Sequence, residues 1–258
     1  MGASVHLAFL GDFGDAVKFI FHQRDSVGGG VKIGGPGELW GFAQTHLLVS
    51  AVAMAIACAV SIPLGLYLGH KGKGEFLAIS VSNVGRAVPA VVLVFFLVAY
   101  IGNGFATITA VLVALAIPPI LTNTYVGVAQ VDREIVDAAQ GMGMRSSQII
   151  SRVRLPLALP TIFAGIRTSA VSVLATATIG PYADVKTLGW PILTPQTYGF
   201  PGQLGAALVV ALLTLVADAG IGYLQHMVTP KGIKLAAEGR TAMRRRLSLP
   251  TRRREAAT

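Results

Sequence analysis

The chain has few charged residues and almost no cysteine. Asp, Glu, Lys and Arg make up 13% of its 258 residues, whereas soluble proteins carry about 25%. A hydrophobic content of 53% and a mean hydropathy of +0.65 accompany this shortage. The composition therefore excludes an ordinary soluble domain and indicates a polytopic membrane protein.

Other absences exclude further classes. The single cysteine, Cys58, cannot form an internal disulfide. Residues 1–39 carry several charges and no long apolar core beside a cleavage site, so no cleavable signal peptide is expected. The apolar stretches lack clustered His, Cys or paired carboxylates, which disfavours a membrane enzyme. The chain also lacks a GxxxxGK[ST] loop, so we expect no ATP site and no cofactor on it.

Five stretches are apolar enough to cross a bilayer, which requires ~20 residues. We expect an all-α fold with spans at about 47–68, 77–101, 105–128, 157–179 and 204–228. Pro118 and Pro119 are expected to interrupt the third span, and Arg167 lies near the start of the fourth.

The chain is expected to have three parts. Residues 1–39 form a peripheral helix, at about 7–21, followed by a glycine-rich linker. Residues 40–230 form the membrane domain, which includes a polar loop at 129–156. Residues 231–258 form a basic tail.

Lysine and arginine predict the orientation. Five spans put the 69–76 loop, the 129–156 loop and the C-terminal tail on one side, with 15 of the 21 Lys and Arg residues. Only 4 lie on the other side. The polar loop and the C-terminus are therefore expected in the cytoplasm and the N-terminus outside. Topology explains most of the net charge of +9, so we expect no nucleic-acid partner, although the tail can rest on anionic lipid.

The polar loop contains the segment EIVDAAQGMGMRSSQIISRVRLP at residues 134–156. Asp132 is placed to cap a helix whose first turn carries Glu134, because negative charge is favourable at a helix N-terminus. Gly141 and Gly143 are expected to break this helix.

A second short helix is expected after the glycines. Ser146 or Ser147 can cap it, and Pro156 is expected to end it. Its apolar residues share one face: Ile149, Ile150 and Val153. Two short helices with an apolar ridge form an element suited to docking in a groove of a partner.

This loop resembles the signature of a known family. It resembles the EAA motif of ABC importer permeases: Asp137-Ala138-Ala139 is followed by three residues, Gly143, nine residues and then Val153-Arg154-Leu155-Pro156. Relative to that motif, Asp137 replaces Glu and Val153 replaces Ile. The resemblance implies the type I permease fold and a coupling helix that contacts a cytoplasmic ATPase subunit. The residues it implies for this contact are Glu134, Asp137, Ala138, Ala139, Gly143, Val153, Leu155 and Pro156.

Further stretches at 45–65, 83–89, 121–128, 155–160 and 164–168 look like the osmoprotectant branch of that family. This branch imports glycine betaine, carnitine, choline, proline betaine and related quaternary amines. The resemblance implies ATP and Mg bound by a partner ATPase dimer, an extracytoplasmic binding protein, and a second permease subunit that is the same chain or a homologue.

Charges inside spans are costly and often functional. Asp218 lies in the fifth span and is expected to pair with Arg86 or Arg167, which we place toward the cytoplasmic ends of their spans. The candidates for the gate or pathway are Asn83, Arg86, Pro89, Asn123, Arg167 and Asp218.

Two other functions remain open from the sequence. The first keeps the class and changes the cargo to methionine or another amino acid. The second is an ion-coupled secondary transporter, which would require inverted repeats and charged sites at the middle of the membrane. No convincing internal repeat is present, and a secondary transporter has no use for the polar loop.

Overall fold

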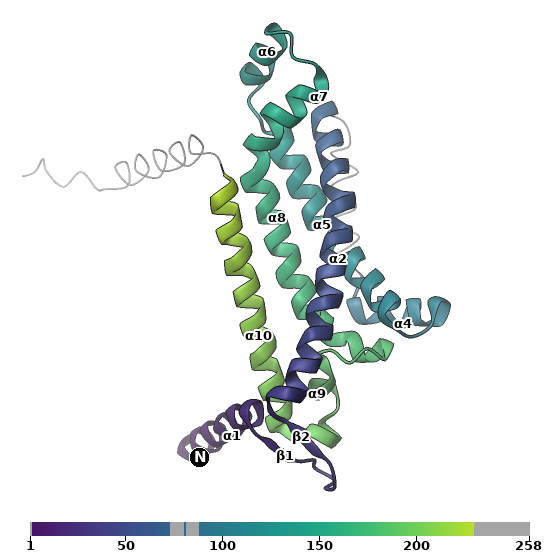
Figure 1. Cartoon of the computed structure of the whole chain (residues 1–258), viewed down its shortest axis with the longest axis vertical. Helices are drawn as coiled ribbons and strands as arrows, with labels where there is room; N and C mark the ends of the chain where they lie inside the picture. The colour runs from purple at the N-terminus through teal and green to yellow at the C-terminus, as the bar shows by residue number, and fades with distance from the viewer. Residues whose placement is uncertain (1, 73–79, 81–87, 230–258) are drawn as a thin grey trace, which may run out of the picture.

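The computed structural model describes residues 2–72, 80 and 88–229 of the chain. Four helices run side by side and form the bundle (Figure 1). They are α2 (Gly35–Lys71), α5 (Phe105–Ala129), α8 (Leu155–Thr176) and α10 (Pro195–Val228). Each contributes to a described helix that is long and apolar enough to cross a membrane. The basic tail at 231–258 lies outside the described residues.

The expected second span is described only in its second half. This half is α4 (Ala90–Ile101), a helix of 12 apolar residues. Pro89 is its N-cap, with an extended ψ of 129°, so the proline marks a helix start and not a bend within a continuous helix. Asn83 and Arg86 lie outside the described residues.

Two prolines lie inside α5 without interrupting it, contrary to expectation. The helix continues through Pro118 and Pro119 to Ala129. Neighbouring helices bond the backbone beside the prolines: Ser169 Oγ of α8 donates to the Ala116 carbonyl at 2.9 Å, and Ser61 Oγ of α2 donates to the Ile117 carbonyl at 3.3 Å. Such bonds explain how a proline-containing helix is tolerated in a membrane.

Glycines bring the central helices into close contact. A Cβ added at Gly65 of α2 would lie 2.7 Å from the Thr124 Cβ of α5, and one at Gly69 would lie 2.8 Å from the Val128 Cβ. On α8, a Cβ at Gly165 would lie 2.8 Å from the Pro119 carbonyl oxygen of α5. Small residues at these positions allow the close backbone approach that stabilises helix pairs in lipid.

The N-terminal residues are more ordered than the expected linker. After α1 (Gly2–Phe21), β1 (Gln23–Asp25) and β2 (Lys32–Gly34) form an antiparallel hairpin in which Arg24 pairs with Ile33. Gly29 and Gly30 have φ of +76° and +79° and belong to its turn, where the Ser26 amide donates to the Val31 carbonyl. The glycines therefore serve a tight turn, for which positive φ is required, and not a flexible linker.

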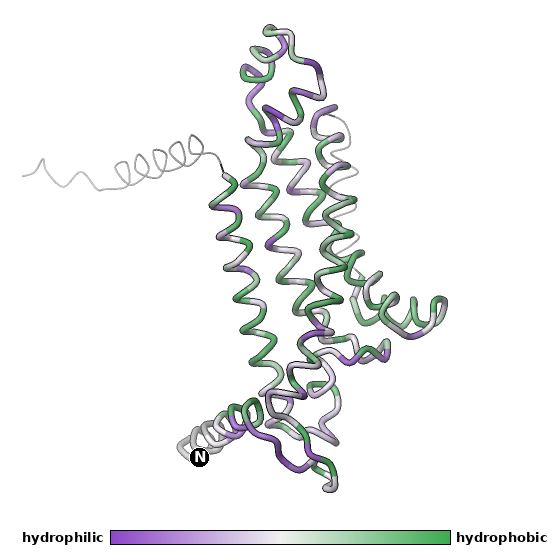
Figure 2. The backbone as a smooth tube through the Cα atoms, in the orientation of Figure 1, coloured by the Kyte–Doolittle hydropathy of each residue, from purple (hydrophilic) through white to green (hydrophobic). Residues whose placement is uncertain are grey.

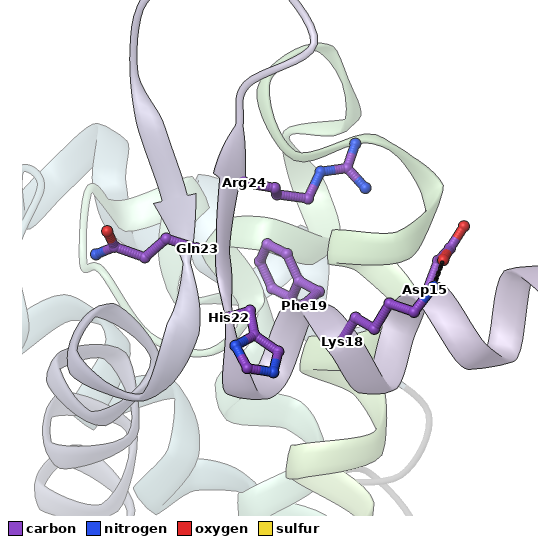
Figure 3. A pocket seen from close by; sticks show the side chains of 6 residues that line it. All are labelled: Asp15, Lys18, Phe19, His22, Gln23 and Arg24. Atoms are coloured by element: carbon purple, nitrogen blue, oxygen red, sulfur yellow. Dashed lines mark hydrogen bonds and ion pairs between the residues drawn. The ribbon is translucent and has the colours of Figure 1, made fainter.

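Phe19 anchors α1 to the bundle. Its side chain is 1% exposed, and the ring occupies a socket where Cβ atoms at Gly34, Gly202 and Gly205 would approach within 3.4 Å of it. Tyr198 meets the Phe19 ring edge to face at a centroid distance of 6.1 Å, and its hydroxyl donates to Glu38 at 2.6 Å. Figure 3 shows Phe19 between α1 and the hairpin, beside the ion pair of Lys18 and Asp15.

Two short helical segments connect α8 to α10. They are η2 (Ala177–Ala183) and α9 (Gly189–Leu193). Thr187 Oγ1 donates to the Ala177 carbonyl at 2.8 Å, and the Ala183 carbonyl accepts from the Gly104 amide at the start of α5. These bonds join the connection to the end of the bundle that carries α1 and the hairpin.

Hydropathy follows the geometry of the bundle. Figure 2 shows hydrophobic residues along the long helices and hydrophilic residues in the polar loop at one end and in the hairpin at the other. The outward residues of α10 include Leu212, Leu215, Val216 and Leu224. A large apolar exterior between two polar ends fits a protein surrounded by lipid.

Substitution of Gly65 tests the close contact between α2 and α5. Gly65→Ala places a Cβ against Thr124, so we expect the free energy of unfolding to fall by ~1–3 kcal/mol. The matched control is Gly41→Ala on the same helix, where a Cβ meets nothing within 4 Å and alanine is the better helix former. Thermal unfolding in detergent compares the two, and equal midpoints would contradict the packing argument.

Candidate functional site

The polar loop begins with a capped helix. The side chain of Asp132 accepts a hydrogen bond from the Glu134 amide at 3.0 Å, as expected, and α6 (Arg133–Gly141) follows. The carboxylates of Asp132 and Glu134 lie at the positive end of the helix dipole, which stabilises this short helix.

Gly143 ends the helix through its backbone conformation. Its φ is +78°, and its amide donates to the Gln140 carbonyl at 2.9 Å, while the Met144 amide donates to the Ala139 carbonyl at 3.2 Å. This is the Schellman pattern, which requires a left-handed residue at the position of Gly143. The expectation of two helix-breaking glycines is wrong for Gly141, because this residue is still helical and has no positive φ.

The second half of the loop is continuous with the membrane domain. α7 (Ser146–Ile149) runs through the π-helical turn η1 (Ile150–Arg154) into α8. Pro156 lies in the first turn of α8, so the expectation that it ends a helix is wrong. Pro156 comes just after the π-helical turn, and such a turn is a place where a helix accommodates the amide that a proline lacks.

The cap of α7 also differs from the expectation. The N-cap residue is Arg145, not Ser146 or Ser147, and the Arg145 amide donates to the side chain of Gln148 at 2.8 Å. Ser146 instead contacts His70 at the end of α2, with 2.5 Å between Oγ and Nε2.

The loop has a small apolar core of its own. Val136, Ala139 and Ile149 are buried in it, and three partly buried residues pack against them: Val131, Met144 and Val153. Ala139 is only 2% exposed, so its small size allows packing inside the loop. The expected apolar ridge of the second helix is therefore mostly turned inward.

The outer face of α6 presents a different apolar stripe. Ile135 is 45% exposed and Met142 is 77% exposed, and Ala138 lies exposed between them. The spacing of three and four residues puts these side chains on one helix face. Glu134 and Asp137 are exposed beside them. This outer face is the part of the loop that another protein can reach.

Arg154 joins the base of the loop to two other helices. Its Nη1 donates to the carbonyls of Gly69 and Val128, at 3.2 and 3.4 Å, near the C-terminal ends of α2 and α5. A guanidinium is favourable there because the C-terminal end of a helix carries partial negative charge. Sequence reasoning missed this role, although Arg154 lies inside the Val153-to-Pro156 motif. Leu155 packs beside it, against the cluster of Val128, Ala158 and Ile162.

The structure brings Arg167 and Asp218 together between α8 and α10. Arg167 Nε donates to Oδ1 at 2.8 Å and Nη2 donates to Oδ2 at 2.6 Å, which is the bidentate geometry of a strong ion pair. Because α8 begins at Leu155, Arg167 lies near the middle of its helix and not near the start, contrary to expectation. Of the two arginines considered as partners, Arg167 is the one that pairs with Asp218.

The two other pathway candidates that the structure describes, Asn123 and Pro89, do not join this pair. Asn123 donates to the Pro119 carbonyl of its own helix at 2.8 Å, so it makes no bond between helices there. Pro89 lies at the start of α4. Their roles in a pathway stay predictions.

Residues 61–230 match the model of the family described as binding-protein-dependent transport system inner membrane component. The chain belongs to this family. It is a multi-pass inner-membrane permease component of an ABC importer.

The permease has curated relatives that cover most of its length. It is 36% identical over 195 residues to the carnitine transport permease protein OpuCB of Listeria monocytogenes, which covers 75% of this chain and 89% of the relative. It is 31% identical over 199 residues to the glycine betaine/carnitine/choline transport system permease protein OpuCB of Bacillus subtilis, covering 77% and 92%.

Solved structures show the same fold. An inward-facing structure of the MetNI methionine ABC transporter matches with a TM-score of 0.65 at 17% identity, covering 75% of this chain and 97% of that chain. An amino acid ABC transporter crystallised with histidines matches with a TM-score of 0.55 at 17% identity, covering 74% and 92%. The expected all-α type I permease fold is thereby confirmed.

The Schellman geometry predicts that Gly143 and Gly141 respond differently to alanine. Gly143→Ala forces a left-handed alanine, which costs ~1–2 kcal/mol, so we expect trypsin to cleave after the neighbouring Arg145 about five- to thirtyfold faster. Gly141→Ala is the control, because this position is helical and open. Equal cleavage rates in the two variants would contradict the cap.

Exchange of the two charges tests the ion pair. We expect Arg167→Gln and Asp218→Asn each to lower the midpoint of thermal unfolding, because each leaves a charge without its partner inside the bundle. The double exchange, Arg167→Asp with Asp218→Arg, is expected to recover most of the loss. If the double exchange lowers the unfolding midpoint by the sum of the two single losses, the ion pair contributes nothing to stability.

Proposed function

We propose that this permease imports quaternary-amine osmoprotectants with energy from ATP hydrolysed on a partner chain. The proposal rests on the sequence similarity of the permease to its relatives. Relatives at 30–36% identity over about three quarters of the chain are permeases for carnitine, glycine betaine or choline. The methionine transporter is only 17–18% identical, and this likeness concerns the fold. Methionine or another amino acid is therefore the second candidate cargo.

The outer face of α6 is the proposed contact with the ATPase. Its stripe of Ile135, Ala138 and Met142 is exposed, and Glu134 and Asp137 flank it. The Asp132 cap, the Gly143 turn and the small apolar core hold this face in one conformation. A preformed apolar helix face with charged neighbours is suited to docking in a groove of a partner.

The loop has a mechanical route into the bundle. α7, η1 and α8 form one continuous helical path, and Arg154 joins its base to the ends of α2 and α5. A displacement of α6 by the ATPase would therefore move three helices together. Val153, Leu155 and Pro156 serve this transmission from inside the loop and the bundle, whereas Ala138 faces outward.

The proposed assembly has three kinds of subunit. Two ATPase subunits bind ATP and Mg in the cytoplasm and contact two permease subunits, which are copies of this chain or this chain with a homologue. A binding protein delivers cargo outside. The distribution of lysine and arginine supports an orientation with α6 and the C-terminal residues on the cytoplasmic side. The end of the bundle with α1 and the hairpin, opposite α6, would then lie outside (Figure 1). A secondary transporter is disfavoured, because it requires no such loop.

Ala138→Arg tests the contact with the ATPase. We expect a bulky charge on the outer face of α6 to abolish co-purification of the ATPase subunit in mild detergent, and to reduce binding-protein-stimulated ATP hydrolysis at least tenfold. The control is Ala129→Arg, where the same substitution lies exposed at the last residue of α5. The coupling proposal fails if the ATPase co-purifies equally with both variants.

The cargo is tested in liposomes that contain the complete complex. ATP-dependent uptake of radiolabelled glycine betaine, carnitine or choline is expected in the presence of the binding protein. Uptake of methionine with none of the quaternary amines would favour the second candidate.

A further inference from the structure

An open cavity with both polar and apolar lining lies between α8 and α10 at the ion pair. It has a volume of about 450 Å³ and is lined by Ala164, Arg167, Thr168, Val171, Ser172 and Asp218. Neither charged side chain is enclosed: Arg167 is 38% exposed and Asp218 is 33% exposed. The ion pair is therefore accessible to a small molecule from one side.

The cavity lies deep in the membrane domain. Arg167 is 12 residues after Leu155 in α8, and Asp218 is 10 residues before Val228 in α10, which correspond to roughly 18 and 15 Å along the helices. The hydrocarbon core is ~30 Å thick, so both charges lie near its centre. Within the described spans, the other Asp, Glu, Lys and Arg residues lie near helix ends.

The surroundings of the cavity differ from a lipid-facing surface. The open face of α8 carries mostly small or polar residues, Ala164, Thr168, Ser172 and Ala175, with Val171 as the large apolar residue among them. The outward face of α10 carries large apolar residues, such as Leu212 and Leu215. Half-exposed charges in a membrane face protein or a water-filled path, because lipid cannot solvate them. The α8 face with the ion pair is thus suited to border a pathway that the second permease subunit closes.

We propose that this cavity is a transit site for zwitterionic quaternary amines, in which Arg167 receives the cargo carboxylate and Asp218 faces its quaternary ammonium group. The inference rests on the proposed function, from which it takes the class of cargo.

The chemistry of the two side chains matches both ends of such a cargo. The guanidinium fork binds a carboxylate through two parallel hydrogen bonds, as it binds Asp218 in the absence of cargo. A quaternary ammonium has no N–H to donate, so it is bound by negative charge or by aromatic faces and not through a directed hydrogen bond. Asp218 supplies the negative charge in this site. Gly222 of α10 lies beside the guanidinium, since a Cβ there would lie 3.5 Å from the Arg167 Cζ, in ordinary van der Waals contact.

Exchange with the cargo keeps all charges compensated. Without cargo, Arg167 and Asp218 neutralise each other and avoid an unpaired charge in a low-dielectric region. A zwitterion brings one carboxylate and one cation, so the single ion pair is replaced by two. The two side chains can therefore separate to bind a zwitterion without leaving either charge unpaired.

The test compares two cargoes that differ at one end. Choline has the quaternary ammonium of glycine betaine but a hydroxymethyl group in place of the carboxylate. In the complete complex in liposomes, Arg167→Gln is expected to lower the ratio of glycine betaine to choline uptake about tenfold, the effect of 1.4 kcal/mol of lost carboxylate binding. Asp218→Asn is expected to raise this ratio, because Arg167 then has no internal partner and its uncompensated charge attracts the carboxylate of glycine betaine and repels the cation of choline.

Two further variants separate recognition from folding. Arg167→Lys keeps the charge and the pairing with Asp218 but lacks the bidentate fork, so the ratio is expected to fall while the unfolding midpoint stays near that of the wild type. Thr214→Val lies one turn before Asp218 and outside the cavity lining, and is expected to leave the ratio unchanged.

An equal fall of both uptakes in all charge variants would overturn the transit site and leave a structural ion pair. If the wild type carries only one of the two cargoes, the test is the uptake per ATP hydrolysed in the charge variants. The transit site predicts that uptake falls while binding-protein-stimulated ATP hydrolysis continues. A parallel loss of uptake and hydrolysis would overturn the transit site. Wild-type uptake of neither cargo would overturn the proposed function, and the transit site with it.

Discussion

The close approach of α2, α5 and α8 is the constraint on which the rest of the structure depends. In lipid, burial of apolar side chains does little to hold helices together, because the lipid tails are equally apolar. The described helices associate instead through backbone contact at Gly65, Gly69 and Gly165, and through hydroxyl groups that donate to carbonyls of another helix. A fixed spacing of these helices is what allows Arg154 to reach the ends of α2 and α5.

The same spacing decides how the polar loop is held. Arg154 can bond two helix ends only if they lie next to each other, and the π-helical turn leads from the loop into α8 without a break. The loop is thus a rigid extension of the bundle and not a tether. Its outer face is built from residues that its own core does not use, which leaves Ile135, Ala138 and Met142 available for a partner.

At the other end, Phe19 is the central residue of the contact between the N-terminal unit and the bundle. Phe19 occupies a socket of glycines from β2 and α10, and Tyr198 joins the ring to Glu38 at the start of α2. Midway between the two ends, Arg167 and Asp218 bridge α8 and α10. The bundle therefore has a distinct polar contact at each level, while its outside remains apolar.

The sequence by itself determined the features that local patterns carry. Long apolar runs predicted the helices, the spacing of Asp137, Gly143 and Pro156 predicted the loop and the family, and Asp132 predicted the cap, because each depends on residues close together in the chain. The tertiary structure decided which distant residues meet. Arg167 pairs with Asp218, Arg154 bonds two helix ends, and Phe19 packs among glycines of β2 and α10, since these contacts depend on how the helices pack. It also decided that the glycines near residue 30 form a turn and that the helix continues through Pro156, because these residues permit several local conformations and the surrounding contacts select one.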